Sequence, residues 1–157
     1  MSVYHIDKLM AEARRLAAEY RRATGKALAI SGEIAVADAI RLLGLEAAPE
    51  GAEGYDVVRH TPTGPVRLQV KARLVFDDTR RPHRLGQLKV EQDWDAVLLV
   101  LMDENYEVVE ILEAARPAIA EALAEARPNR RGTLSVARFR NLGRAVWARE
   151  DGTVDTR

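Results

Sequence analysis

The sequence contains no cysteine among its 157 residues. This absence excludes disulfide bonds, cysteine-ligated zinc sites and thiol nucleophiles. The three histidines, His5, His60 and His83, are scattered along the chain, so a metal site built from imidazoles is not expected. A phosphate-binding glycine loop and internal repeats are also missing from the sequence. Several large classes of enzyme are therefore excluded before any motif is considered.

Long apolar runs are missing as well. No run approaches the roughly 20 residues that a transmembrane helix needs, and the first residues, Met1–Asp7, contain no apolar signal core. We therefore expect a cytoplasmic protein without a membrane partner. Apolar residues make up 47% of the chain, which favours a globular fold over disorder. A chain of this length is expected to form a single domain, residues 1–157.

Periodic apolar residues predict two helices at the start of the chain, an N-terminal helix over residues 3–24 and a second over residues 32–43 that Gly44 stops. Further on, the unbroken apolar run within residues 95–102 predicts a central strand that is covered on both faces. A turn at 103–105 and a returning strand over 106–112 follow.

The C-terminal segment, residues 116–150, is expected to be helical and rich in arginine. Pro117 suits the first turn of a helix that runs to about residue 127, and Ser135 could cap a short last helix. Two helices, about four strands and then further helices predict a mixed α+β fold, with a central mixed sheet flanked by helices.

Residues 55–71 predict a β-hairpin whose turn is Thr61-Pro62-Thr63-Gly64. With that turn as a four-residue loop, Asp56 lies directly across from Gln69. Because side chains alternate between the faces of a strand, Asp56, Gln69 and Lys71 are expected on one face. The opposite, core face would hold the following side chains: Tyr55, Val57, Val66, Leu68 and Val70.

This polar cluster has the groups needed to hold a divalent metal beside a phosphodiester. Asp56 is a hard oxygen ligand for Mg²⁺, and the Gln69 amide oxygen and Val70 carbonyl could complete the protein ligands. Lys71 could position or deprotonate an attacking water, or neutralise developing charge. Glu33, near the start of the second helix, could bind the metal through water or accept a proton.

Each of these residues also has an ordinary structural explanation. Gln69 and Lys71 could be polar filler on a solvent-facing strand. Asp56 comes two residues after Gly54, and an aspartate at such a position is common in turns. A carboxylate such as Glu33 is favoured near a helix N-terminus by the helix dipole. The four residues together, in this order, are more specific than any one of them.

Taken together, the pattern resembles the PD-(D/E)xK, or restriction-endonuclease-like, superfamily of nucleases. The resemblance covers roughly residues 28–115 and is carried by Gly32-Glu33-Ile34-Ala35, Gly54-Tyr55-Asp56 and Gln69-Val70-Lys71. In two departures from the family pattern, Tyr55 stands where proline is frequent and Gln69 replaces the usual Asp or Glu, which removes one negative charge. The resemblance implies a restriction-endonuclease-like core and cleavage of DNA with Mg²⁺ or Mn²⁺ as cofactor.

Charge is segregated along the chain although the formal net charge is zero. Residues 91–113 hold eight acids and no base, whereas residues 126–149 hold seven arginines and no acid. A second basic stretch follows Lys71 and contains Arg73, Arg80, Arg81, His83, Arg84 and Lys89. Segregated charge can form a basic groove for nucleic acid despite overall neutrality. The residues expected to contact nucleic acid are Arg73, Arg80, Arg81, Arg84, Arg138, Arg140 and Arg144.

Two rival functions stay open at this stage. The chain could be a catalytically inactive module with the same fold that binds nucleic acid or a partner protein. It could also be a small interaction protein in which the acidic and basic segments pair within an oligomer, so a homodimer is one of the assemblies to consider.

Overall fold

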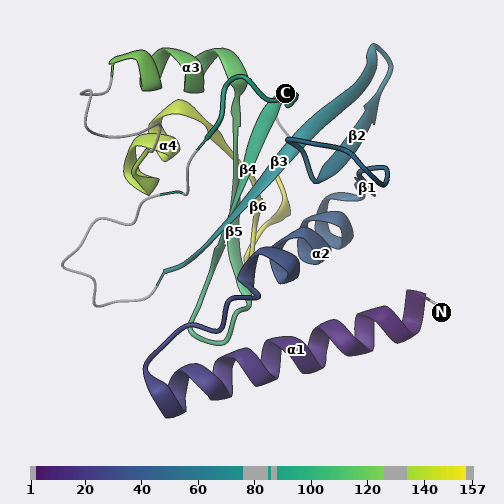
Figure 1. Cartoon of the computed structure of the whole chain (residues 1–157), viewed down its shortest axis with the longest axis vertical. Coiled ribbons are helices and arrows are strands. Elements are labelled where there is room, and N and C mark those ends of the chain that lie inside the picture. The colour runs from purple at the N-terminus through teal and green to yellow at the C-terminus, as the bar shows by residue number, and fades with distance from the viewer. Residues whose placement is uncertain (1–2, 76–84, 86–87, 126–133, 155–157) are drawn as a thin grey trace.

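One curled mixed β-sheet runs through the protein and separates two pairs of helices (Figure 1). The computed structural model describes residues 3–75, 85, 88–125 and 134–154. The helices of this part are α1 (Val3–Thr24), α2 (Ser31–Leu43), α3 (Arg116–Glu125) and α4 (Val136–Leu142). Its strands are β1 (Glu46–Ala47), β2 (Val57–Thr61), β3 (Gly64–Leu74), β4 (Ala96–Met102), β5 (Val108–Ala115), β6 (Arg144–Ala148) and β7 (Gly152–Thr153).

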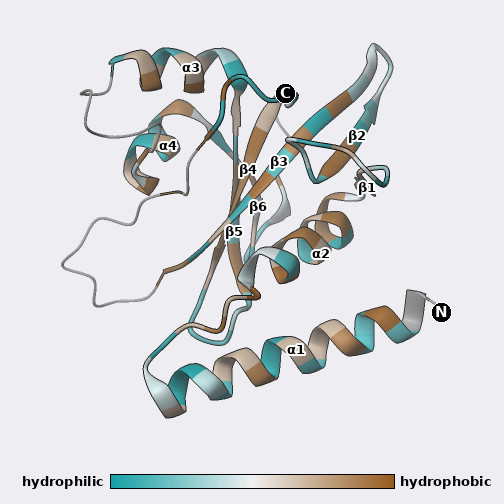
Figure 2. Cartoon of the chain, viewed as in Figure 1, coloured by the Kyte–Doolittle hydropathy of each residue, from teal (hydrophilic) through white to brown (hydrophobic). Residues whose placement is uncertain are grey.

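The seven described strands lie in the sheet in the order in which they occur in the chain. Neighbouring strands are antiparallel except β3 and β4, which are parallel and are connected through residues 75–95. Every residue of β4 is buried, and the strand is brown along its length in Figure 2. The prediction of a central strand covered on both faces is therefore confirmed.

The two faces of the sheet belong to two different cores. Leu68, Val70 and Ala72 of β3 pack in the core that contains the buried residues of α1 and α2. The other core contains Ile119 of α3 and Phe139 of α4, together with Trp94 and alternate residues of β4. Alternation along β3 therefore turns the side chains between Leu68, Val70 and Ala72 toward the α3 and α4 side of the sheet.

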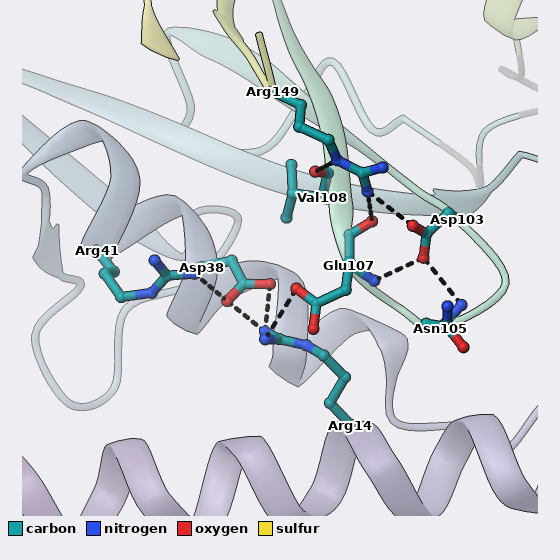
Figure 3. Close-up of polar contacts among 8 residues, drawn as sticks. All are labelled: Arg14, Asp38, Arg41, Asp103, Asn105, Glu107, Val108 and Arg149. Atoms are coloured by element: carbon teal, nitrogen blue, oxygen red, sulfur yellow. Dashed lines mark hydrogen bonds and ion pairs between the residues drawn. The ribbon is translucent and has the colours of Figure 1, made fainter.

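Helix α1 contacts the rest of the protein through small residues. Ala17 and Ala18 are buried, whereas the larger apolar side chains Ile6, Leu9, Leu16 and Tyr20 are 44%, 41%, 57% and 40% exposed. The Arg14 guanidinium lies 2.5 and 2.6 Å from the two carboxylate oxygens of Asp38 on α2 (Figure 3). This nearly buried ion pair joins α1 to α2.

Several details of the sequence-based prediction are confirmed. Helices α1 and α2 span the predicted residues within one position at each end, and Gly44 ends α2 in the left-handed conformation with φ of 63°. Ser135 caps α4 by accepting a hydrogen bond from the Arg138 amide. None of the helices in the described ranges is long and apolar enough to span a bilayer.

Other details are wrong. The sheet is larger than the predicted four strands, and the C-terminal segment contains β6 and β7 in addition to helices. The hairpin loop consists of Pro62 and Thr63 alone, because Thr61 and Gly64 already pair. Tyr55 packs against the α3 and α4 core, on the other side of the sheet from the predicted core face. Tyr55 precedes β2, so the strict alternation of a strand does not apply to it.

Candidate functional site

Asp56 lies across from Gln69, as the hairpin register requires. Val57 pairs with Leu68, and the Asp56 amide donates a hydrogen bond of 2.9 Å to the Leu68 carbonyl. The predicted register is therefore confirmed even though the loop is shorter. Asp56 is the last residue of the chain before β2 begins, whereas β3 continues beyond it toward Leu74 (Figure 1).

The carboxylate of Asp56 continues the hydrogen bonding between the two strands just before β2 begins. Its Oδ2 accepts a hydrogen bond of 2.8 Å from the Val70 amide. In a strand, the N–H and C=O of one residue point toward the same neighbour, so the Val70 carbonyl also lies on the edge of β3 that faces Asp56. Among the residues that the structure describes, none donates a hydrogen bond to Asp56 Oδ1.

Gln69 carries an amide oxygen that is buried without a hydrogen-bond donor in the described structure. A buried polar atom of this kind costs free energy unless water, an ion or a ligand satisfies it. Gln69 pairs with Val97 of β4, so its side chain lies on the α3 and α4 side of the sheet. The unpaired oxygen is therefore a specific observation in favour of a ligand at this position.

Lys71 lies two residues further along the same face and pairs with Leu99. Burial lowers the pKa of its ammonium group, and Arg73 and Lys89 lower this pKa further, while Asp56 opposes the shift. These groups are therefore close enough to interact electrostatically with Lys71. Besides Asp56, Lys71 thus has two cations, Arg73 and Lys89, among its electrostatic neighbours.

Arg73 is half-buried, and burial lowers the pKa of its guanidinium. Its Nη1 donates a hydrogen bond of 2.6 Å to the Ala72 carbonyl. The sequence placed Lys89 in a basic stretch but did not assign it to the site. The sequence indicated only that Lys89 follows Lys71 in the chain. Its place beside the site depends on the path of the connection between β3 and β4, which the sequence does not reveal.

Glu33 is not joined to this cluster. It is exposed in the first turn of α2, the helix that covers the Leu68, Val70 and Ala72 face of β3. Gln69 and Lys71 point to the opposite face. Glu33 forms no hydrogen bond or ion pair with any residue in the described ranges.

The predicted nucleic-acid contacts are only partly described. Arg80, Arg81 and Arg84 lie outside the described residues. Arg140 Nη1 lies 2.7 Å from Glu110 Oε1, and Arg138 Nη2 lies 3.2 Å from Glu125 Oε2. Of these two partners, Glu110 belongs to the acidic segment 91–113 and Glu125 does not, so the Arg140 pair alone of the two joins the basic segment to that acidic segment.

Arg144 differs from Arg138 and Arg140. It is exposed at the start of β6 and has no ion pair with the residues of the described structure. Strand β6 lies three strands away from β3, which corresponds to roughly 14 Å at the usual strand spacing. Arg144 is thus separated from Lys71 along the sheet, and its pairing with Glu113, which pairs with Leu98 of the α1 and α2 core, places it on the opposite face.

The donor set is suited to a hard divalent cation. Asp56 Oδ1, Gln69 Oε1 and the Val70 carbonyl supply three oxygen atoms from neighbouring positions, and the first two have no protein donor in the described structure. Mg²⁺ prefers oxygen ligands and retains waters when few protein ligands are present. The described residues contain no group of three or more His, Cys, Asp or Glu side chains that could hold a metal. A metal here would therefore depend on amide and carbonyl oxygens.

Comparison with known proteins adds no assignment, since no protein-family model and no curated protein matches the chain.

Proposed function

We propose that the chain is a metal-dependent phosphodiester hydrolase that cleaves DNA at the site formed by Asp56, Gln69, Val70 and Lys71. The unpaired, buried Gln69 oxygen beside Asp56 and Lys71 is the observation that carries this proposal. It is supported by the resemblance of these residues to the PD-(D/E)xK pattern. The restriction-endonuclease-like fold belongs to the same proposal.

In this proposal, Asp56 Oδ1, Gln69 Oε1 and the Val70 carbonyl hold Mg²⁺ or Mn²⁺. The ion, when bound, lowers the pKa of a water molecule and neutralises charge on the phosphate. Lys71 binds a phosphate oxygen as the ammonium ion, or takes a proton from the attacking water as the neutral amine. The lowered pKa of Lys71 makes the neutral form easier to reach.

A cleavage assay with purified protein tests this proposal. Wild type is incubated with duplex, branched and single-stranded DNA in Mg²⁺, in Mn²⁺ and in EDTA. We expect cleavage only with metal, and we expect Lys71→Ala to reduce its rate by on the order of 10²–10³. Lys26→Ala, at an exposed position after α1, is the matched control. If wild type cuts none of these substrates with either metal, the hydrolase proposal fails.

The second candidate is a non-catalytic module of the same fold that binds nucleic acid. Two observations favour it: Gln69 is neutral, and Glu33 lies on the helix covering the opposite face of β3. Both reduce the negative charge available to hold a cation. Binding of DNA in EDTA, without cleavage in Mn²⁺, would support this candidate.

A further inference from the structure

The loop before β4 fixes the backbone of a lysine beside the candidate site. Leu88 and Trp94 are buried in the core on the α3 and α4 side of the sheet, where Gln69 and Lys71 also point. Between them lies Lys89, whose side chain is exposed. The Trp94 indole Nε1 donates a hydrogen bond of 2.8 Å to the Lys89 carbonyl.

Trp94 is itself held firmly. It is 1% exposed, and the guanidinium of Arg116, at the start of α3, lies 4.7 Å from the centre of its ring. Arg116 Nη1 also donates hydrogen bonds of 2.7 and 2.8 Å to the carbonyls of Gln92 and Trp94. The loop is therefore attached to both the core and α3, so the position of Lys89 does not depend on its own side-chain contacts.

The same loop touches the segment that leads to Asp56. Gly54 has φ of 93°, and a Cβ there would lie 2.9 Å from the Gln92 Cβ and 3.0 Å from the Asp93 nitrogen. Only glycine permits both this conformation and this approach. The electrostatic effect of Lys89 on Lys71 is consistent with the packing. Asp56 and Lys89 are thus positioned by adjoining segments.

We propose that Lys89 is a substrate-positioning residue whose ammonium group binds a nucleic-acid phosphate next to the one that is cleaved. Trp94 and Arg116 act through it by fixing the loop. The inference rests on the proposed function, because it assigns a phosphodiester ligand to the same site. Lys71 lies on the strand beside Asp56 and Gln69, whereas Lys89 approaches from the loop and is exposed. Lys89 is therefore suited to hold the substrate and not to take part in the chemical step.

The test compares Lys89→Ala, Lys89→Arg and wild type, with Lys8→Ala on α1 as an exposed-lysine control. Affinity for DNA is measured in EDTA at several salt concentrations, and kcat and KM are measured with metal. For Lys89→Ala we expect a Kd and KM raised by on the order of tenfold, with kcat changed less than about twofold. The slope of log K against log salt should fall by about 0.9 for a duplex. Lys89→Arg should restore most of the affinity and Lys8→Ala should match wild type.

A double-mutant cycle tests the role of Trp94. Trp94→Phe removes the indole donor but keeps an aromatic ring, so we expect an affinity between wild type and Lys89→Ala. The double variant should bind no more weakly than Lys89→Ala, because both changes act through one contact. If Trp94→Phe lowers the melting temperature strongly, the affinity and salt slope of Lys89→Ala alone decide whether Lys89 binds a phosphate.

The outcomes separate the two proposals. DNA binding by wild type that Lys89→Ala leaves unchanged, in affinity and in salt slope, overturns the role of Lys89 while the hydrolase proposal stands on its own assay. A wild type that binds DNA without cutting it contradicts the hydrolase proposal. The effect of Lys89→Ala on affinity and salt slope then still tests the role of Lys89. A wild type that neither binds nor cuts DNA overturns both.

Discussion

Asp56 Oδ2 lies 2.8 Å from the amide nitrogen of Val70, so the carboxylate just before β2 is hydrogen-bonded to the middle residue of Gln69-Val70-Lys71. The hydrogen bond occupies one carboxylate oxygen and leaves the other for a ligand. Substitution can separate this structural role of Asp56 from its proposed role as a metal ligand, since a neutral acceptor can replace the structural role but not the charge.

Replacement of Asp56 should distinguish these roles. Asp56→Asn retains an oxygen for the Val70 amide, so we expect a free energy of unfolding within about 1 kcal/mol of wild type but no Mn²⁺ binding. Asp56→Ala leaves the Val70 amide without its partner and should cost about 1–3 kcal/mol more than Asn. Urea unfolding and calorimetry measure the two effects. Equal Mn²⁺ binding by wild type and Asp56→Asn would exclude Asp56 as a ligand.

Restoring a carboxylate at position 69 should strengthen metal binding. Gln69→Glu adds one negative charge beside Asp56, so we expect tighter Mn²⁺ binding than in wild type. Calorimetry at millimolar metal measures the difference. Asn141→Asp, which adds a charge at an exposed position of α4, is the control and should bind like wild type. Identical affinities for all three proteins would contradict a metal site at Gln69.

The ion pair between Arg14 and Asp38 should contribute strongly to stability. The Asp38 side chain is 4% exposed and that of Arg14 is 15% exposed, so removal of Asp38 leaves a mostly buried guanidinium whose remaining acidic partner in the described structure is Glu107, 3.5 Å away. We expect Asp38→Ala to cost about 3–5 kcal/mol in urea unfolding. Glu19→Ala, which removes the exposed partner of Arg15, should cost only about 0.5 kcal/mol. Similar costs for the two variants would show that Arg14 is well solvated.

Acid should weaken the ion pair between Asp103, in the turn between β4 and β5, and Arg149, which directly follows β6 (Figure 3). Burial alone raises the pKa of Asp103, but hydrogen bonds from Arg149 and from backbone amides outweigh this effect and hold the pKa below its usual value. Because the folded pKa lies below the unfolded one, this stabilisation is present above about pH 4 and is lost as the pH falls further. Asp103→Asn should therefore lose stability less steeply than wild type between pH 4 and pH 2 in urea titrations. Parallel curves would contradict the assignment.

The C-terminal arginines should divide into two kinds. Arg140 pairs with Glu110 at 2.7 Å, and Arg140→Ala should lower stability by up to about 1 kcal/mol with little change in DNA affinity. Arg144 is exposed without such a pair in the described structure, so Arg144→Ala should weaken DNA binding and flatten its salt dependence without affecting the melting temperature. Equal effects of the two variants on binding would contradict this division.

Local patterns were sufficient to predict the elements that local forces determine. The proline and glycine of the turn predicted that Asp56 would oppose Gln69, and the apolar run predicted buried β4. Strand β6 was missed because Arg144–Ala148 has no strand alternation of its own and becomes a strand by pairing with β5. The position of Glu33 could not be predicted either, because the face of the sheet that α2 covers is decided by packing between distant segments.

The polar set comes almost entirely from one hairpin, from Asp56 to Lys71, whose register a two-residue turn determines. If this hairpin were transferred onto another sheet, Asp56, Gln69 and Lys71 would keep their positions relative to one another. The electrostatic surroundings of Lys71 would not be transferred with it, because its neighbour Leu99 belongs to β4 and the nearby cation Lys89 to the loop before β4. The positions of the proposed ligands are thus encoded locally, while the lowered pKa of Lys71 depends on the whole fold.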